Sequence, residues 1–333
     1  MQQGDRVHIP EGFINLPTSV GAAAVAGGSV WASMKAASTE LKDRLVPFAG
    51  LTAAFVFALQ MLNFPVAAGT TGHLLGGALA AVLLGPWLGI VAVTVVVVIQ
   101  ALLFADGGLV AMGLNVFNMA VITAISGWYV FRGVVKILPR RIGVLVASLA
   151  AGWVSVVVSS IGFSIQYAIG GVGGVDPGLV FSSMVGVHAL IGIGEGLITA
   201  AAVGAVLAAR PDLVTGARGI TEVETVSTSL SKRAVGGFVG VGLAAAVALV
   251  MFVAPIAAAG PDGLERVAQE TGFAATAQDN AYAGPFADYG VAGLENQTLG
   301  TVVSGLVGIG LTFAAGMIFV GLARRRSHRT EPA

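Results

Sequence analysis

Long apolar runs separated by short polar stretches make up most of the chain. Residues 45–105 carry no Asp, Glu, Lys or Arg. A helix that crosses a lipid bilayer needs about 20 apolar residues, so this run alone predicts three crossings, divided by residues 65–73 and 85–87. The same reasoning along the whole chain predicts spans over nine segments: 17–37, 46–64, 74–86 with its flanks, 88–104, 112–131, 143–168, 184–208, 237–259 and 300–323.

The positions of Lys and Arg test this count, because the cytoplasmic loops of a membrane protein collect positive charge. With nine spans, fifteen of the 17 basic residues fall on one side of the membrane, and only Arg6 and Arg266 fall on the other. The predicted fold class is therefore an all-α integral membrane protein. We expect a polytopic bundle of about nine transmembrane helices, seven plus two, with the N-terminus outside and the C-terminus cytoplasmic.

A polar stretch rich in Thr and Ser divides the apolar segments into two groups. The polar composition of residues 209–235 predicts a cytoplasmic linker. This linker separates a membrane domain at 1–208 from a second module at 236–333. The loop 260–299 of the second module is predicted to be external and contains six acidic residues but no histidine, so we expect no strong transition-metal ligand from it.

Composition supports a membrane protein and excludes several other classes. Hydrophobic residues make up 56% of the chain and charged residues 10%, with a mean hydropathy of +0.90, whereas a soluble domain is about 25% charged. The lipid bilayer is thus the expected environment of the chain. Its formal net charge is zero, so the composition does not indicate the excess of basic residues that a nucleic-acid-binding protein carries. Because the chain has no cysteine, any metal must be held by nitrogen or oxygen.

Histidines are few, and two of them lie where a metal ion could enter. The four histidines are His8, His73, His188 and His328, and imidazole is the commonest side-chain ligand for transition metals. His8 lies in the segment His-Ile-Pro-Glu-Gly-Phe at residues 8–13, and His73 lies in the glycine-rich segment 69–77. Both precede long uncharged runs at the predicted outer face. They are also compatible with a simpler role as polar residues at a water interface.

Five segments of the first domain form a distinctive set of motifs: His-Ile-Pro-Glu-Gly-Phe (8–13), Asn-Phe-Pro-Val (63–66), Leu-Gly-Pro (84–86), Gln-Ala-Leu-Leu-Phe-Ala-Asp-Gly-Gly-Leu (100–109) and Gly-Leu-Asn-Val-Phe-Asn-Met (113–119). The second module carries Pro-Asp-Gly-Leu-Glu at 261–265. The first set resembles the motifs of the CbiM/NikM substrate-binding membrane subunits of cobalt and nickel energy-coupling-factor (ECF) importers, and this resemblance covers about residues 7–209. The motif of the second module resembles that of the CbiN/NikN accessory subunit.

The resemblance implies a subunit of a larger importer in the plasma membrane of a bacterium or archaeon. Its expected partners are a CbiQ/NikQ-like transmembrane coupling subunit and CbiO/NikO-like ATPase subunits. The chain itself has no Walker A pattern, so ATP hydrolysis is expected from those partners, and we expect neither an enzyme nor a resident cofactor. The ion is the transported substrate, Ni²⁺ or Co²⁺.

The metal site is expected at the outer mouth of the bundle. If the mature chain begins at residue 7, its amine, the His8 amide nitrogen and the His8 imidazole can chelate one ion in fused rings, which leaves a fourth position for His73. Four nitrogens in a plane suit nickel(II), and the family resemblance implies the same four donors. Residue 7 is Val in the sequence, and a GTG codon there can start translation as methionine. If residues 1–6 are retained, no free amine lies beside His8.

Five polar residues inside the apolar segments are candidates for a supporting role. His188 and Glu195 are seven positions apart on one predicted helix and so share a face; they either support the site through hydrogen bonds or contact the metal directly. Gln100, Asn115 and Asn118 either orient His73 or tie helices together. Asp106, in Ala-Asp-Gly-Gly, is expected to form a turn, and His328 to belong to a solvated tail.

Two other classes of protein are weighed against the importer subunit. A secondary transporter driven by an ion gradient would need a relay of intramembrane carboxylates, and Glu195 alone is a poor relay. An intramembrane metalloenzyme could use His73, His188 and Glu195 as zinc ligands. Between the two metals we favour nickel, because the loop Gly-Thr-Thr-Gly-His at 69–73 looks more like that of the nickel members.

Overall fold

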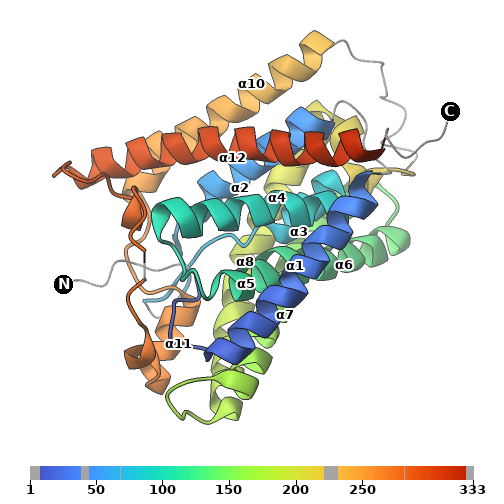
Figure 1. The fold of residues 1–333 in the computed structure, drawn as a ribbon. Helices are drawn as coiled ribbons and strands as arrows, with labels where there is room; N and C mark the ends of the chain where they lie inside the picture. Colours follow the sequence, from blue (N-terminus) through green and yellow to red (C-terminus); the bar gives the residue numbers. More distant parts are fainter. Residues whose placement is uncertain (1–7, 39–44, 68, 221–231, 281, 328–333) are drawn as a thin grey trace.

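The computed structural model describes residues 8–38, 45–67, 69–220, 232–280 and 282–327, and over these residues the fold is a bundle of helices (Figure 1). Its one sheet is a pair of two-residue antiparallel strands, β1 (Phe64–Pro65) and β2 (Thr71–Gly72). The helices are α1 (Leu16–Ser38), α2 (Leu45–Gln60), α3 (Gly77–Leu84), α4 (Pro86–Ile99) with η1 (Gln100–Phe104), α5 (Met112–Asn115) with η2 (Val116–Ile122) and α6 (Thr123–Ile137), α7 (Arg141–Gly170), α8 (Pro177–Ala209), α10 (Lys232–Ala248) with η5 (Leu249–Val253) and η6 (Ala254–Ile256), α11 (Gly263–Thr271), α12 (Gln297–Ser327), and single turns η3 (Pro211–Leu213), η4 (Thr215–Ala217), η7 (Ala274–Thr276) and η8 (Ala287–Tyr289).

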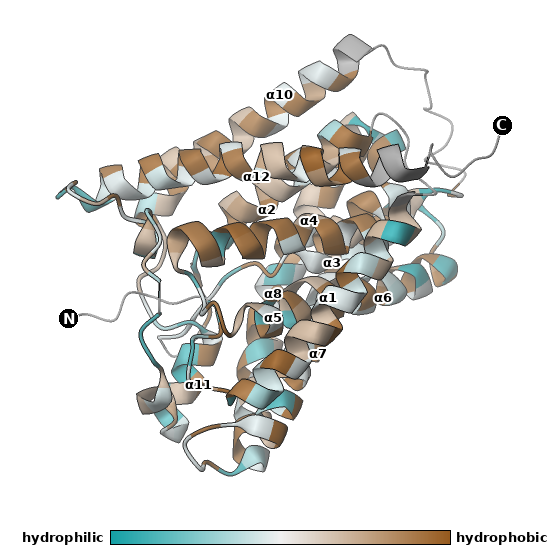
Figure 2. Cartoon of the chain, in the orientation of Figure 1, coloured by the Kyte–Doolittle hydropathy of each residue, from teal (hydrophilic) through white to brown (hydrophobic). Residues whose placement is uncertain are grey.

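The described helices form a multi-pass membrane protein. Six helical stretches are long and apolar enough to cross a bilayer: Pro86–Phe104, Met112–Ile137, Arg141–Gly170, Pro177–Ala209, Val235–Ile256 and Gln297–Leu322. Hydrophobic residues run along most of their length, and hydrophilic ones gather at the two ends (Figure 2). Large apolar side chains such as Trp31, Val241 and Ile318 are 64%, 71% and 58% exposed, as expected for surfaces that face lipid. The count of nine spans and their direction across the membrane stay predictions.

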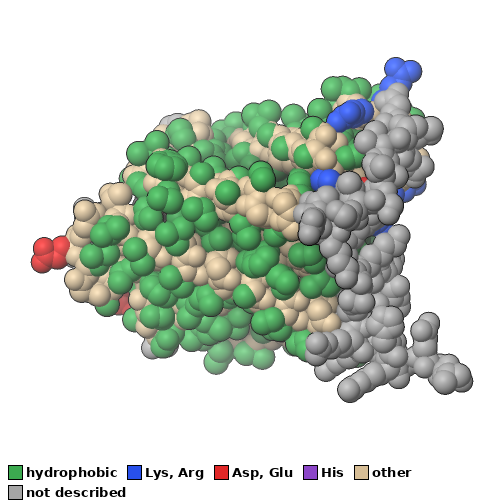
Figure 3. Space-filling view, turned by 90° about the horizontal axis from the view of Figure 1, so that it is seen from above, with side chains coloured by type: hydrophobic (Ala, Val, Ile, Leu, Met, Phe, Trp, Pro, Cys, Tyr) green, Lys and Arg blue, Asp and Glu red, His purple; other side chains and the backbone are tan. Residues whose placement is uncertain are grey.

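Basic residues gather at one end of the bundle. Arg132 on α6 and Arg141 on α7 donate hydrogen bonds to the carbonyls of Gly216 and Leu207, respectively. In the face shown by Figure 3, Lys and Arg side chains lie at one end and an acidic side chain at the other, with apolar side chains between them. The chain between α6 and α7 and the segment after α8 therefore lie at the same end of the bundle.

α3 is much shorter than the span predicted over residues 74–86. It has eight residues, about 12 Å at 1.5 Å per residue, which is too short to cross the hydrocarbon core of a bilayer. Gly76 precedes it with φ +82° and Gly85 follows it with φ +90°, conformations that glycine adopts readily and that interrupt the helix at both ends. The segment that carries His73 therefore enters the bundle as extended chain, and α3 is buried along its whole length.

The C-terminal module packs against the first domain through α12 and α2. A Cβ added at Gly308 would lie 2.0 Å from Cζ of Phe57, and one at Gly316 would lie 3.1 Å from Cα of Gly50. Small residues at these positions let the two helices approach closely, as is common in membrane proteins. The chain between η6 and α12, which includes α11, then crosses one end of the bundle (Figure 1).

Candidate metal centre

His8 is buried in the segment that leads into α1. Its side chain lies in the bundle because Asn115, at the end of α5, binds the next residue twice. The amide of Asn115 accepts a hydrogen bond from the Ile9 N–H at 2.9 Å and donates one to the Ile9 carbonyl at 3.1 Å. His8 is 2% exposed, so this pair of bonds fixes a buried imidazole at the end of the bundle.

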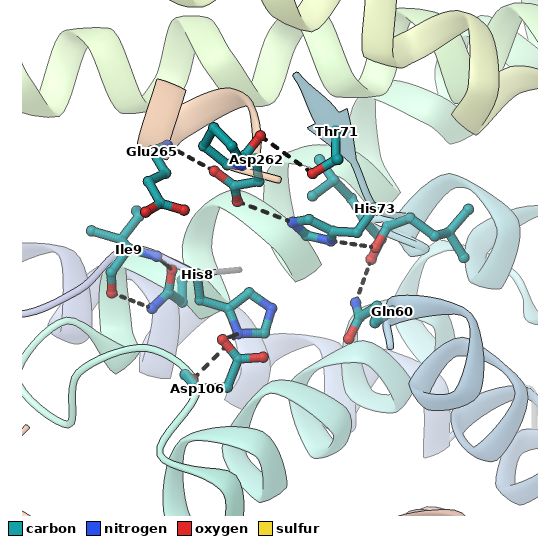
Figure 4. Close-up of polar contacts among 12 residues, drawn as sticks. His8, Ile9, Gln60, Thr71, His73, Asp106, Asp262 and Glu265 are labelled. Atoms are coloured by element: carbon teal, nitrogen blue, oxygen red, sulfur yellow. Dashed lines mark hydrogen bonds and ion pairs between the residues drawn. The ribbon is translucent and has the colours of Figure 1, made fainter. Parts of the chain in front are cut away.

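His73 follows β2 directly and faces His8. Its Nδ1 lies 3.0 Å from the Leu74 carbonyl, which directs Nε2 away from its own backbone. The two imidazole rings have centroids 5.8 Å apart and are nearly perpendicular, at 83°. The structure thus brings together two residues 65 positions apart in sequence at the place where a metal site was expected (Figure 4).

Asp106 is the closest charged partner of His8. Nδ1 of His8 lies 3.1 Å from the Asp106 carboxylate, and Tyr289 donates a hydrogen bond to that carboxylate at 2.7 Å. Gln100 in turn donates to the Tyr289 hydroxyl at 3.1 Å. Burial by itself lowers the pKa of His8, but the charge and hydrogen bonds of Asp106 outweigh it, so this pKa lies above its ordinary value. Burial raises the pKa of Asp106, but His8 and Tyr289 bring it below its ordinary value.

Asp262, from the Pro-Asp-Gly-Leu-Glu motif of the C-terminal module, is the corresponding partner of His73. Its Oδ2 lies 3.8 Å from Nε2 of His73 (Figure 4), and the residue is 6% exposed. Burial, the largest cause, raises the pKa of Asp262 to about 7, although the Glu265 N–H that binds its carboxylate acts in the opposite direction. Each of the two histidines therefore has one carboxylate beside it.

Glu195 supports the loop of His73 from inside the bundle. It is fully buried on α8, and its two carboxylate oxygens accept hydrogen bonds from the Leu75 and Gly76 N–H groups at 2.6 and 2.9 Å. Extended chain inside a membrane protein needs such partners, because its backbone groups are not paired with one another as they are in a helix. Gln60 adds a hydrogen bond to the Leu75 carbonyl at 2.9 Å.

A cavity of about 60 Å³ opens beside the two histidines. Asn118 on η2 lies in its wall and donates a hydrogen bond to Gln166 at 2.7 Å. His188 on α8 also borders the cavity, with Nδ1 2.8 Å from the Met184 carbonyl. The lining residues that concern the site are His8, His73, Asn115, Asn118, His188 and Asp262.

The predicted site residues therefore fall into two groups around this cavity. His8, His73, Asn115, Asn118 and His188 border it directly, whereas Gln100 and Glu195 act on it through Tyr289 and the His73 loop. Val7 and His328 lie outside the described residues. In the part of the chain that the structure describes, no group of three or more His, Asp or Glu side chains is close enough together to hold a metal ion.

Sequence reasoning missed three residues of this site. Asp106 was interpreted as a turn residue, and the turn exists, since Ala105 and Gly107 have positive φ, but its carboxylate also pairs with His8. Asp262 and Tyr289 belong to the other module and reach the site only through folding. The sequence features that could have pointed to these two residues are the Pro-Asp-Gly-Leu-Glu motif, which contains Asp262, and the segment Asp-Tyr-Gly at 288–290, which contains Tyr289.

The comparisons with known proteins agree with this architecture. The chain belongs to the family described as "Cobalt uptake substrate-specific transmembrane region", which matches residues 8–213, and the "PDGLE domain" matches residues 236–325. A protein of Archaeoglobus fulgidus, provisionally named a fused nickel transport protein NikMN, is 34% identical over 324 residues, which are 96% of this chain and 99% of that protein. The "Fused nickel transport protein NikMN" of Rhodobacter capsulatus is 28% identical and covers 95% and 98% of the two chains.

A solved structure extends the agreement to the fold. The crystal structure of a transition metal transporter superposes with a TM-score of 0.55 at 27% identity and covers 66% of this chain and 98% of that one. This chain is thus a multi-pass membrane component of metal-ion transport and not an enzyme. Membrane components of this family work within multi-subunit transporters.

Proposed function

We propose that this chain is the substrate-binding membrane subunit of an ECF-type importer that takes up nickel(II). The observation that carries this proposal is the pair of buried imidazoles, His8 and His73, which face each other 5.8 Å apart at the end of a membrane bundle. Binding a divalent cation here requires little rearrangement of the fold, because Asn115 and Glu195 already hold the backbone beside each histidine.

The proposed ligands are the amine of residue 7, the amide nitrogen and imidazole of His8, and the imidazole of His73. In this chelate the imidazole of His8 binds through Nδ1, since only that nitrogen closes a six-membered ring with its own amide. Nδ1 is the atom beside Asp106 in the structure, so the ion replaces a carboxylate–imidazole contact when it binds. A planar set of four nitrogens favours nickel(II), and the fused nickel relatives support the same choice.

The proposed division of the chain follows from this function. Residues 1–208 form the metal-binding domain, residues 209–235 a cytoplasmic linker, and residues 236–333 the accessory domain. Transport then requires a CbiQ/NikQ-like coupling subunit and CbiO/NikO-like ATPase subunits, because the chain has no phosphate-binding loop of its own.

Uptake of ⁶³Ni by cells that express the chain with and without candidate partner subunits tests the proposal. We expect accumulation only with active ATPase subunits, and no effect of an ionophore that collapses ion gradients while ATP is maintained. Gradient-dependent uptake without the partners would indicate a secondary transporter instead. Intact-mass measurement of the purified protein gives its first residue, and a mature chain that starts at Met1 and still binds nickel through four coplanar nitrogens would contradict the proposed ligand set.

A further inference from the structure

The start of α11 is docked against the strand pair that carries His73. The Thr71 N–H donates to the Pro261 carbonyl at 3.0 Å, and the Thr71 hydroxyl donates to the Gly260 carbonyl at 2.9 Å. Gly263 lies so close to α8 that an added Cβ would be 2.4 Å from Ile191 and 3.0 Å from His188. The residue between these contacts, Asp262, is therefore held by hydrogen bonds to the backbone before it and by the close packing of Gly263 after it.

The two oxygens of Asp262 have different surroundings. Oδ1 accepts a hydrogen bond from the Glu265 N–H at 2.7 Å and so caps α11, while Oδ2 lies 3.8 Å from Nε2 of His73. A distance of 3.8 Å is too long for a hydrogen bond. Nitrogen and oxygen ligands lie about 2.0–2.2 Å from a transition metal, so two ligands of one ion are about 3–4 Å apart, depending on the angle between them. Two ligands at right angles on one ion are about 3 Å apart, so a shift of about 1 Å brings Oδ2 and Nε2 onto the same ion.

The charges around the cavity also match a divalent cation. Asp106 and Asp262 are both buried, and none of the described residues that line the cavity is Lys or Arg. Buried carboxylates need a nearby positive charge, and a divalent ion at the two histidines supplies it.

We propose that Asp262 is a fifth ligand of the transported ion, outside the plane of the four nitrogens, so that the Pro-Asp-Gly-Leu-Glu motif of the C-terminal module supplies an oxygen donor to the histidine site. This inference rests on the proposed function and adds to it the role of the second module at the site itself. The carboxylate reaches His73 from the module's loop, so the ion meets Asp262 together with Nε2 of His73. The proposal departs from the expectation, based on the lack of histidine in this loop, that the module provides no strong ligand.

A cysteine in place of Asp262 tests direct contact, because the chain has no cysteine of its own. When the full-length Asp262→Cys protein is titrated with Co²⁺, a thiolate bound to the metal gives an intense near-ultraviolet charge-transfer band, since thiolates are good ligands for such ions. The matched control is Glu270→Cys on the same helix, whose glutamate is exposed and pairs with Arg266 at 2.6 Å. We expect the band with Asp262→Cys and not with Glu270→Cys. Bound metal without a band in Asp262→Cys would overturn the proposal.

A second variant tests the same proposal if the Asp262→Cys protein does not fold. Asp262→Asn retains an oxygen that caps α11 but lacks the negative charge, and we expect about a 10- to 100-fold loss of Ni²⁺ affinity, with Glu270→Gln unchanged. Wild-type affinity in Asp262→Asn together with loss of binding in His73→Ala would overturn the role of Asp262 and leave the proposed function intact. Wild-type affinity in His73→Ala would instead contradict the proposed function.

Discussion

The side chain of Asn115 binds both backbone groups of Ile9, as a neighbouring strand would. The N–H of Ile9 donates to Oδ1 at 2.9 Å, and its carbonyl accepts from Nδ2 at 3.1 Å. The consequence is that His8, one position earlier, is held over the cavity by a residue 107 positions away. Asn115 therefore positions His8, a proposed ligand, and is not itself a proposed ligand of the ion.

Replacing Asn115 should weaken metal binding as well as the fold. Asn115→Ala removes both hydrogen bonds and leaves the buried N–H of Ile9 without its acceptor, a cost of about 1–3 kcal/mol. We expect nickel affinity to fall about 10- to 100-fold, measured by competition with a coloured chelator. The control is Asn296→Ala, which removes an exposed hydrogen bond at the start of α12. Equal affinity in the two variants would show that the bonds to Ile9 do not position His8.

Glu195 offers a similar test for His73. In Glu195→Gln one of the two carboxylate oxygens becomes an NH₂ group, which cannot accept a hydrogen bond from the Leu75 or Gly76 N–H. We expect a loss of nickel affinity of at least about tenfold and a lower melting temperature. Glu195→Asp, which keeps the charge on a shorter side chain, should recover part of the affinity. If Glu195→Gln binds nickel as the wild type does, the loop holds His73 without this carboxylate.

The direction of the chain across the membrane can be tested with single cysteines, because no native cysteine interferes. The charge distribution predicts that residue 229, which lies outside the described residues, is cytoplasmic and that Ala275, exposed in the structure, is external. In intact cells an impermeant thiol reagent should label Ala275→Cys and not Ser229→Cys. The reverse labelling would contradict the predicted orientation.

Nickel affinity should fall as the pH falls. Metal ligands bind without their protons, and the raised pKa of His8 means that its imidazole keeps a proton to a higher pH than an ordinary histidine. Below that pKa the ion must displace the proton, so each pH unit costs up to about tenfold in affinity for one proton released. Titrations between about pH 8 and 6 measure the slope. An affinity independent of pH over this range would exclude His8 and its amide nitrogen as ligands.

Among the described residues, six of the nine predicted spans correspond to helical stretches long and apolar enough to cross a bilayer, and the span predicted over residues 74–86 contains instead the short buried helix α3. Hydropathy alone cannot separate an apolar segment that faces lipid from one enclosed by other helices, and residues 74–86 belong to the second kind. The structure ends α3 at glycines with positive φ on both sides. The extended chain before it is possible because Glu195, seven residues after His188 on α8, binds its backbone.

For the site, sequence reasoning found the two histidines but not their carboxylate partners. His8 and His73 stand out because histidine is rare in the chain. Asp106 and Asp262 do not stand out, since acidic residues in polar loops are usually solvated, and only the tertiary fold shows that both are buried. Contacts between residues 98 positions apart, such as His8 with Asp106, leave no periodic signal in a single sequence.

The central claim is that His8 and His73 together hold the transported ion, and equilibrium titration of the purified full-length protein with Ni²⁺ tests it most directly. The account predicts one tightly bound ion in the wild type, loss of that binding in both His8→Ala and His73→Ala, and wild-type binding in His328→Ala. Melting temperatures of the same samples show whether each variant is folded. A folded His8→Ala or His73→Ala protein that binds nickel as tightly as the wild type would contradict the account.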